Sequence, residues 1–294
     1  MSLAVSPETP VSPRRETWRQ FRHLMRRDVL AMVSIVWIVA MVLACGGAYL
    51  FLKSESLKQN LDRRLEAPSL HHGWKYLLGT DGLGRPYLER LLVAGATTLT
   101  ISLLVVVLAA IFGSILGVLA GFGHGAVDTL IMRVSDILMA FPSMLLALVA
   151  LYTFSAGIPV LIGVLVVTRL PIYVRTARGE ALRTKGLLYV RAAEISGVGY
   201  WTIATRHILR AALPALWTLA TFEIALTMLT ESGLSFLGVG VQPPGTSWGL
   251  LTSYGQTYIY TSWWVAVMPG VAIMLTAAAL RAVGTVVGRV LEGY

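Results

Sequence analysis

The chain has 294 residues, of which 56% are hydrophobic and only 13% are charged, and its net charge is +9. Soluble domains usually carry charge on about a quarter of their residues. This composition therefore excludes an ordinary soluble domain and indicates a protein whose solvent is the lipid bilayer.

Six apolar runs are candidates for transmembrane helices. A helix needs roughly 20 apolar residues to cross a hydrocarbon core of about 30 Å, because its backbone polar groups must be satisfied within the segment. We expect spans at residues 29–52, 99–121, 137–155, 158–174, 213–241 and 263–280. The fourth run is short and carries Arg169 near its end, and the fifth contains Glu223 and Glu231. The sequence predicts an all-α integral membrane protein with six transmembrane helices.

The region before and within the first run carries no processing or disulfide signal. Residues 1–13 contain three prolines and are expected to form a disordered tail, followed by an Arg-rich juxtamembrane amphipathic helix. A cleaved signal peptide is not expected, because the first run exceeds the usual 7–15 residues or so of a signal sequence. Cys45 is the only cysteine, so it cannot form an internal disulfide, and we expect it to be a buried apolar residue.

The distribution of basic residues predicts the orientation. Cytoplasmic loops carry an excess of lysine and arginine. Of the 24 such residues, 17 lie in or next to segments that six spans would place on the side of the N-terminus. We expect a cytoplasmic tail over residues 1–28, an extracytoplasmic loop over 53–96, and both termini in the cytoplasm of a bacterial inner membrane. Topology and anionic lipid then account for the net charge without a nucleic-acid partner.

Motifs for catalysis and nucleotide binding are missing. The sequence has no Gly-Lys pair, so it lacks the phosphate-binding loop GxxxxGK[ST]. His71 and His72 are adjacent and the other histidines are scattered, which is not the spacing of a metal site. We expect no catalytic residues, no metal site and no cofactor on this chain. A pore or permease is favoured over a membrane-anchored enzyme.

A small-residue stripe lies in the second run. Gly113, Gly117 and Gly121 recur every four residues in "GSILGVLAG". Such a stripe lets a neighbouring helix approach closely in lipid, which favours a central position for this span. The alternative is the general glycine richness of transmembrane helices.

A charged segment of about 39 residues separates the fourth and fifth runs. Within it, "GLLYVRAAEISG" predicts a helix from Leu187 to Ser196, bracketed by Gly186 and Gly197. A helix of about 15 Å is too short to persist alone in water and needs a surface on which to dock. Tyr189, Ala192, Ala193 and Ser196 share one face. That surface is either a partner protein or the inner leaflet of the membrane.

Four motifs in this sequence resemble a known family. "YVRAAEISG", followed nine residues later by "HIL", is similar to the signature loop of the membrane subunits of ATP-binding-cassette importers. It resembles in particular the second permease subunit of the dipeptide, oligopeptide and nickel permease family. "LGTDGLGRPYLERLLVAGA", "VDTLIMRVSDILMAFPSMLLAL" and "SGLSFLGVGVQPPGTSWG" agree in the same order, over about residues 77–270. The sequence departs from the family at Arg191, where the loop usually has a glutamate.

The resemblance implies an importer permease of type I architecture, with its core over residues 97–290. The helix at about 187–196, between spans four and five, would be the cytoplasmic coupling helix. Residues implied to contact the ATPase are Tyr189, Arg191, Ala192, Ala193, Glu194 and Gly197. The implied partners are a homologous second permease, two ATPases that carry ATP and Mg²⁺, and an extracytoplasmic substrate-binding protein. Peptides are the first substrate class, and nickel or another small solute is the alternative.

Glu223 and Glu231 are carboxylates inside an apolar run. A charged residue such as Asp at the bilayer centre costs about 2.5–3.5 kcal/mol, so such residues usually face a cavity or a partner. The two are eight residues apart and lie within about 80° on a helix. Glu223 could line a substrate pathway and meet a cationic group, or it could form a buried hydrogen bond. For Glu231 we favour a buried hydrogen bond or a subunit interface. In an ion-coupled secondary carrier, the other transporter class considered, Glu223 would be the coupling site.

Overall fold

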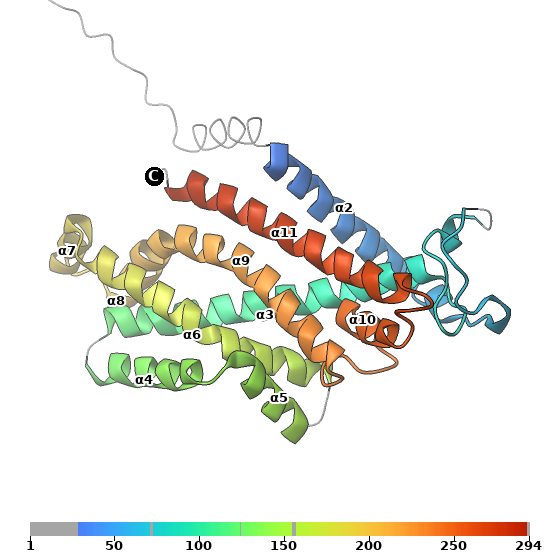
Figure 1. Ribbon diagram of the computed structural model, residues 1–294. Coiled ribbons are helices and arrows are strands. Elements are labelled where there is room, and N and C mark those ends of the chain that lie inside the picture. The colour runs from blue at the N-terminus through green and yellow to red at the C-terminus, as the bar shows by residue number, and fades with distance from the viewer. Residues whose placement is uncertain (1–28, 71–72, 124, 155–156, 293–294) are drawn as a thin grey trace, which may run out of the picture.

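The computed structural model describes residues 29–70, 73–123, 125–154 and 157–292. The expected N-terminal tail and amphipathic helix, and also His71 and His72, lie outside the described residues. The described parts form a bundle of long helices (Figure 1). Their β-type backbone pairing is limited to one isolated antiparallel bridge between Thr80 and Pro86.

Within the described residues, five helices are long and apolar enough to cross a membrane, or up to six if one bent pair counts as a span. They are α2 (Val29–Phe51), α3 (Tyr87–Phe122), α6 (Ile158–Lys185), α9 (Leu209–Phe236) and α11 (Trp264–Glu292). The short α8 (Tyr200–Ile203) runs into α9 through a π-helical turn at 204–208, so these three form one continuous helical segment. Two further short helices are α7 (Leu188–Ile195) and α10 (Trp248–Gln256).

The expected third span at 137–155 is not one straight helix. The chain forms α4 (Ala126–Ala140) and α5 (Ser143–Thr153), which meet at 90°. Phe141, between them, has an extended backbone with ψ of 138°, and Pro142 follows it. Proline lacks a backbone N–H and disfavours helical geometry in the preceding residue. The break therefore has a local cause that a count of apolar residues does not detect.

Two other helices are longer than expected. α3 begins at Tyr87 instead of residue 99, so the last ten residues of the expected 53–96 loop are helical. α6 continues past residue 174 to Lys185. Its extension pairs with α4, since Arg175 lies 2.6 Å from Asp136 and Arg178 lies 2.6 Å from Asp128. These ion pairs stabilise a continuous helix over residues 175–185, in a segment for which the sequence predicted short helices broken at Gly186 and Gly197.

The most extensive helix contact joins α3 and α6. A Cβ atom at Gly113 would lie 2.5 Å from Tyr173 Cβ, and one at Gly121 would lie 2.7 Å from Ala181 Cβ. At Gly117 it would lie 2.6 Å from Ala177 Cβ. The glycine stripe therefore lies on the contact with α6, where the two backbones approach closely.

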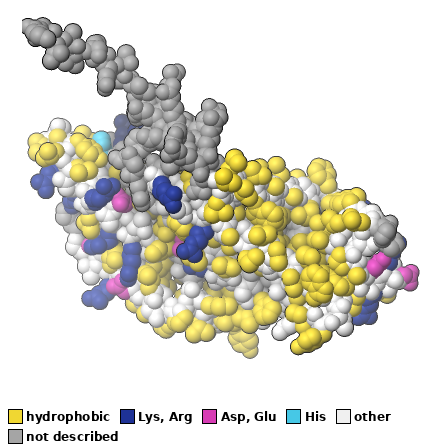
Figure 2. Space-filling view, turned by 45° about the horizontal axis from the view of Figure 1, so that its top comes forward, with side chains coloured by type: hydrophobic (Ala, Val, Ile, Leu, Met, Phe, Trp, Pro, Cys, Tyr) yellow, Lys and Arg dark blue, Asp and Glu magenta, His cyan; other side chains and the backbone are white. Residues whose placement is uncertain are grey.

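The two ends of the bundle differ. α7 and α8 lie at one end, and α10 and the segments at 52–70 and 73–86 lie at the other (Figure 1). Figure 2 shows hydrophobic side chains covering a broad part of the surface, with most of the visible lysines and arginines gathered at one end. An exposed apolar area of this size is typical of a surface that lipid or another subunit covers.

Candidate functional site

The first candidate site is α7, which packs on the end of the bundle through the apolar side chains of Val190 and Ala193. Val190 is fully buried in a cluster that includes Ala181 and Ile203. Leu188 and Ile195, by contrast, are 84% and 88% exposed. The short helix is therefore anchored on one side and presents large apolar side chains on the other.

The C-terminal end of α7 has a complete glycine cap. Gly197 has a φ of +77°, and its N–H donates to Glu194 O at 3.1 Å. The N–H of Val198 donates to Ala193 O at 3.1 Å. These two bonds form a Schellman motif, in which glycine occupies the left-handed position because it has no Cβ to clash. The cap ends α7 and sets the direction in which the chain returns toward α8.

The structure places most residues of the expected contact set on the surface. Tyr189, Arg191, Ala192, Glu194 and Gly197 are exposed, whereas Ala193 is half-buried and packs toward the bundle. The face on which Tyr189, Ala192, Ala193 and Ser196 were expected to lie together is therefore only partly on the surface. Leu188, Ile195 and Trp201, which is 66% exposed, are large surface residues that sequence reasoning missed. They could have been found from the sequence, because they are bulky apolar residues in a segment that is otherwise rich in charge.

The second candidate site lies between α6 and α9. Arg169 Nη1 is 3.6 Å from Glu223 Oε2, and both side chains are largely buried. Arg169 Nη2 also donates to Thr230 Oγ1 at 2.6 Å. Glu223 thus faces a cationic group supplied by the chain itself, a pairing that reduces the cost of placing either charge in an apolar helix bundle.

Glu231 has different surroundings from Glu223. It is fully buried, and the hydroxyl of Ser235 donates to its Oε1 at 2.7 Å. Thr98 on α3 and Ser247 just before α10 also form hydrogen bonds with its carboxylate. Glu231 therefore connects α9 to α3 and α10, while Glu223 connects α9 to α6.

A third polar region lies at the opposite end from α7. Trp264 Nε1 donates to Thr80 O at 3.2 Å, and the hydroxyl of Tyr87 donates to Val265 O. These bonds attach the turn before α3 to the start of α11. The segments that carry "LGTDGLGRPYLER" and "GTSWG" are also brought together, because Trp248 Nε1 donates to Leu91 O at 2.9 Å.

Residues 113–292 match the family model described as "Binding-protein-dependent transport system inner membrane component". This match covers more than half of the chain. The chain belongs to this family. The resemblance to importer permeases is thereby confirmed, and the long apolar helices belong to a multi-pass protein of the inner membrane.

Curated members of this family are similar to the chain over nearly their whole length. A probable D,D-dipeptide transport system permease protein of Escherichia coli is 33% identical over 286 residues, which is 96% of this chain and 95% of that protein. A glutathione transport system permease protein of Pectobacterium atrosepticum is 32% identical over 96% of this chain and 93% of its own. A di/tripeptide transport system permease protein of Pseudomonas aeruginosa is 33% identical over 93% and 89%.

Among the described residues of this family member, no group of three or more His, Cys, Asp or Glu side chains is placed to hold a metal ion. The polar residues that the structure does bring together are the pairs and networks between helices.

Proposed function

We propose that the chain is one of two homologous permease subunits of an ATP-binding-cassette importer that takes up short peptides. The observation that carries this proposal is the end-to-end similarity to permease proteins whose names specify dipeptides, di/tripeptides and glutathione. An extracytoplasmic substrate-binding protein delivers the peptide, and the two permeases enclose its path through the membrane.

In this proposal the chain crosses the membrane six times, with the bent pair α4–α5 serving as one span. Residues 1–28 and the C-terminus lie in the cytoplasm, residues 29–52 form the first span, and 53–96 face outward, although α3 already starts within that last range. The core comprises residues 97–290. The basic residues in the extended part of α6 and around α7 support this orientation, because positive charge favours the cytoplasmic side.

The proposed role of α7 is to couple the membrane helices to a separate ATPase. Leu188 and Ile195 are exposed and apolar, so they suit insertion into a groove of a partner protein. Arg191 and Glu194 flank them on the surface and can form ionic contacts with the groove. ATP and Mg²⁺ bind to the two ATPases, whose closure displaces α7 and switches the pathway between inward- and outward-facing states.

We also propose that Glu223 lines the substrate pathway. Glu223 Oε2 and Arg169 Nε are buried and have no hydrogen-bond partner among the described residues. An ion pair at 3.6 Å with unused bonding capacity can accept a further polar partner. The ammonium group of a peptide would compete with Arg169 for Glu223.

Affinity purification of the tagged chain from its native membrane tests the proposal. A second permease and two ATPases should co-purify, and the complex in liposomes should take up a labelled dipeptide only with ATP and the binding protein present. Uptake driven by an ion gradient without an ATPase would instead establish a secondary carrier. Uptake of nickel but not of the dipeptide would contradict the proposed substrate class.

A further inference from the structure

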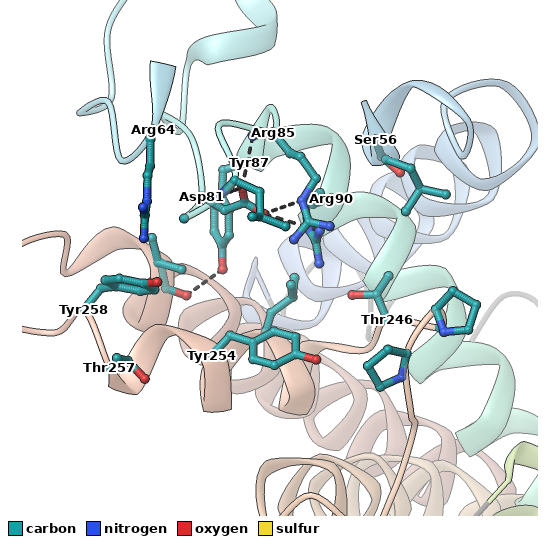
Figure 3. A pocket seen from close by; sticks show the side chains of 18 residues that line it. Ser56, Arg64, Asp81, Arg85, Tyr87, Arg90, Thr246, Tyr254, Thr257 and Tyr258 are labelled. Carbon is teal, nitrogen blue, oxygen red and sulfur yellow. Dashed lines mark hydrogen bonds and ion pairs between the residues drawn. The ribbon is translucent and has the colours of Figure 1, made fainter. Parts of the chain in front are cut away.

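A cavity of about 490 Å³ lies at the end of the bundle opposite α7 (Figure 3). Its volume falls in the range of small-molecule sites, which is roughly 300–1,000 Å³. Four regions line it: the segment at 56–90, the loop at 243–246, the helix α10 with the turn after it, and the start of α11. The cavity is therefore built from parts of the chain that are far apart in sequence.

The most informative side chain in the cavity is Arg90. It is 5% exposed, and its Nη1 lies 3.3 Å from Asp81 Oδ2. Its Nε and Nη1 have no hydrogen-bond partner among the described residues. Buried polar groups are nearly always hydrogen-bonded, so a buried guanidinium with unused donors indicates that an acceptor belongs beside it.

Asp81 cannot supply that acceptor fully, because its carboxylate already has other donors. Its Oδ1 accepts from the N–H groups of Leu83 at 2.8 Å and Arg85 at 3.0 Å. Its Oδ2 accepts from Arg85 Nε at 2.7 Å. Asp81 therefore holds the turn together, and Arg90 retains donors that face the cavity.

The charge of the cavity favours an anion. Arg64, Arg85 and Arg90 line it together with the single carboxylate of Asp81, which leaves two positive charges in excess. Arg64 reaches toward Tyr258 from the segment before α3, and Thr246 lies across from Arg90 (Figure 3). Thr246 Oγ1 is also buried without a hydrogen-bond partner among the described residues. The planar fork of a guanidinium matches the two oxygens of a carboxylate.

We propose that this cavity binds a carboxylate, with Arg90 as its main ligand and Arg64 at its mouth. The carboxylate comes either from the C-terminus of a free peptide or from an acidic side chain of a docked protein. The part that the site plays in uptake rests on the proposed function, whereas carboxylate binding itself does not.

Titration calorimetry on the purified permease complex in nanodiscs tests the proposal with two pairs of probes. The dipeptide Ala-Ala and its C-terminal amide report a terminal carboxylate. N-acetyl-Ala-Glu-Ala-amide and the matched Gln peptide report an acidic side chain. At least one acid should bind ten-fold or more tightly than its uncharged counterpart, and the acid that does so identifies the source.

Variants locate the binding in the cavity. Arg90→Lys and Arg64→Gln should each weaken binding of the preferred acid by about ten-fold, the effect of losing one charge-assisted hydrogen bond. Arg64 is exposed, so its variant should fold even if the Arg90 variant does not. Lys58→Gln is the matched control, because Lys58 is an exposed cation of the same region that pairs with Glu55 outside the cavity.

The proposal is overturned if both acids bind no better than their uncharged counterparts, or if Arg64→Gln behaves like Lys58→Gln. ATP-driven uptake and ATPase co-purification are measured on the same preparations. A complex that binds the acid but lacks ATPases contradicts the proposed function and leaves the carboxylate site standing.

Discussion

Glu223 and Glu231 lie eight residues apart on α9 but bond to different neighbours. Glu223 faces Arg169 on α6, whereas Glu231 accepts hydrogen bonds from serine and threonine hydroxyls on three segments. Glu223 has a single ionic partner, and both Glu223 Oε2 and Arg169 Nε lack a hydrogen-bond partner among the described residues. Glu231 is enclosed in a satisfied network. Two residues of the same type in one helix should therefore respond differently to the same substitution.

Glu231→Ala should destabilise the protein. The substitution removes the acceptor shared by Thr98, Ser235 and Ser247 and leaves their buried hydroxyl hydrogens without an acceptor, at a cost of about 1–3 kcal/mol. Thermal unfolding of the detergent-solubilised complex measures the effect. An unchanged unfolding temperature would show that the network contributes little to stability.

Glu223→Ala should leave assembly of the complex intact and reduce peptide uptake. The substitution removes the proposed contact for the peptide ammonium while the network around Glu231 remains. Radiolabelled dipeptide uptake by reconstituted complex is the measurement, with co-purification of the partners as the control for assembly. If uptake is unchanged, Glu223 does not line the pathway.

Gly117→Ala should also destabilise the protein, because the new methyl group would lie 2.5 Å from Val174 O and 2.6 Å from Ala177 Cβ. Overpacking of this kind costs roughly 1–3 kcal/mol. Gly163→Ala on α6 is the matched control, since no atom lies within 4 Å of a Cβ at that position. Equal unfolding temperatures for the two variants would contradict close packing between α3 and α6.

At the scale of the element, α7 shows what local sequence can and cannot predict. The glycines at 186 and 197 predicted a helix over 187–196, and the structure has one at Leu188–Ile195. Which face turns inward could not be predicted, because that depends on the cluster that receives Val190. The bend between α4 and α5 could have been predicted from Pro142. It was missed because the span at 137–155 was predicted only from the number of consecutive apolar residues.

Gly197→Val should impair the coupling of ATP hydrolysis to transport. A β-branched residue at φ of +77° is strained by roughly 1–2 kcal/mol, so the cap that sets the end of α7 would be lost. Ala193→Leu should act similarly, because Ala193 packs against the bundle. Peptide-stimulated ATPase activity of the reconstituted complex measures the effect.

Gly199→Val provides the control for that experiment. Like Gly197, Gly199 has no atom within 4 Å of a Cβ position, but its φ is −62°. It should therefore retain stimulated ATPase activity. Normal stimulation in both Gly197→Val and Ala193→Leu would contradict the coupling role of α7.

At the scale of the whole molecule, sequence reasoning recovered the membrane class, the family and the approximate positions of most long helices. It missed that α3 begins before residue 99 and that the helix of the fourth run continues unbroken to Lys185, because each expected span was confined to an apolar run. In the folded chain the charged residues outside those runs have partners on other elements, such as Arg178 with Asp128 and Arg90 with Asp81. The cavity at the end opposite α7 could not be predicted either, because its lining residues are far apart in the sequence and come together only in the folded chain.

The proposed topology predicts that Lys58 and Arg191 lie on opposite sides of the membrane. In a Cys45→Ala background, Lys58→Cys should react with a membrane-impermeant maleimide in intact spheroplasts, and Arg191→Cys should react only after permeabilisation. Both positions are exposed in the chain alone, and labelling in cells that lack the ATPases keeps Arg191 clear of its proposed partner. Labelling of both cysteines from the same side would refute a topology in which α7 and Lys58 lie on opposite sides of the membrane.

The length of α3 has a mechanical consequence. Its 36 residues form a rod of about 54 Å, with Arg90 in the first turn and Phe122 in the last. The ring of Phe122 lies 4.5 Å from that of Tyr200, close to where the chain leaves α7. If such a rod pivots at one end by about 5°, its other end sweeps about 5 Å, close to the pitch of one helical turn. A rigid tilt of α3 at the Arg90 end would therefore displace its Phe122 end without any change in the conformation of the helix itself.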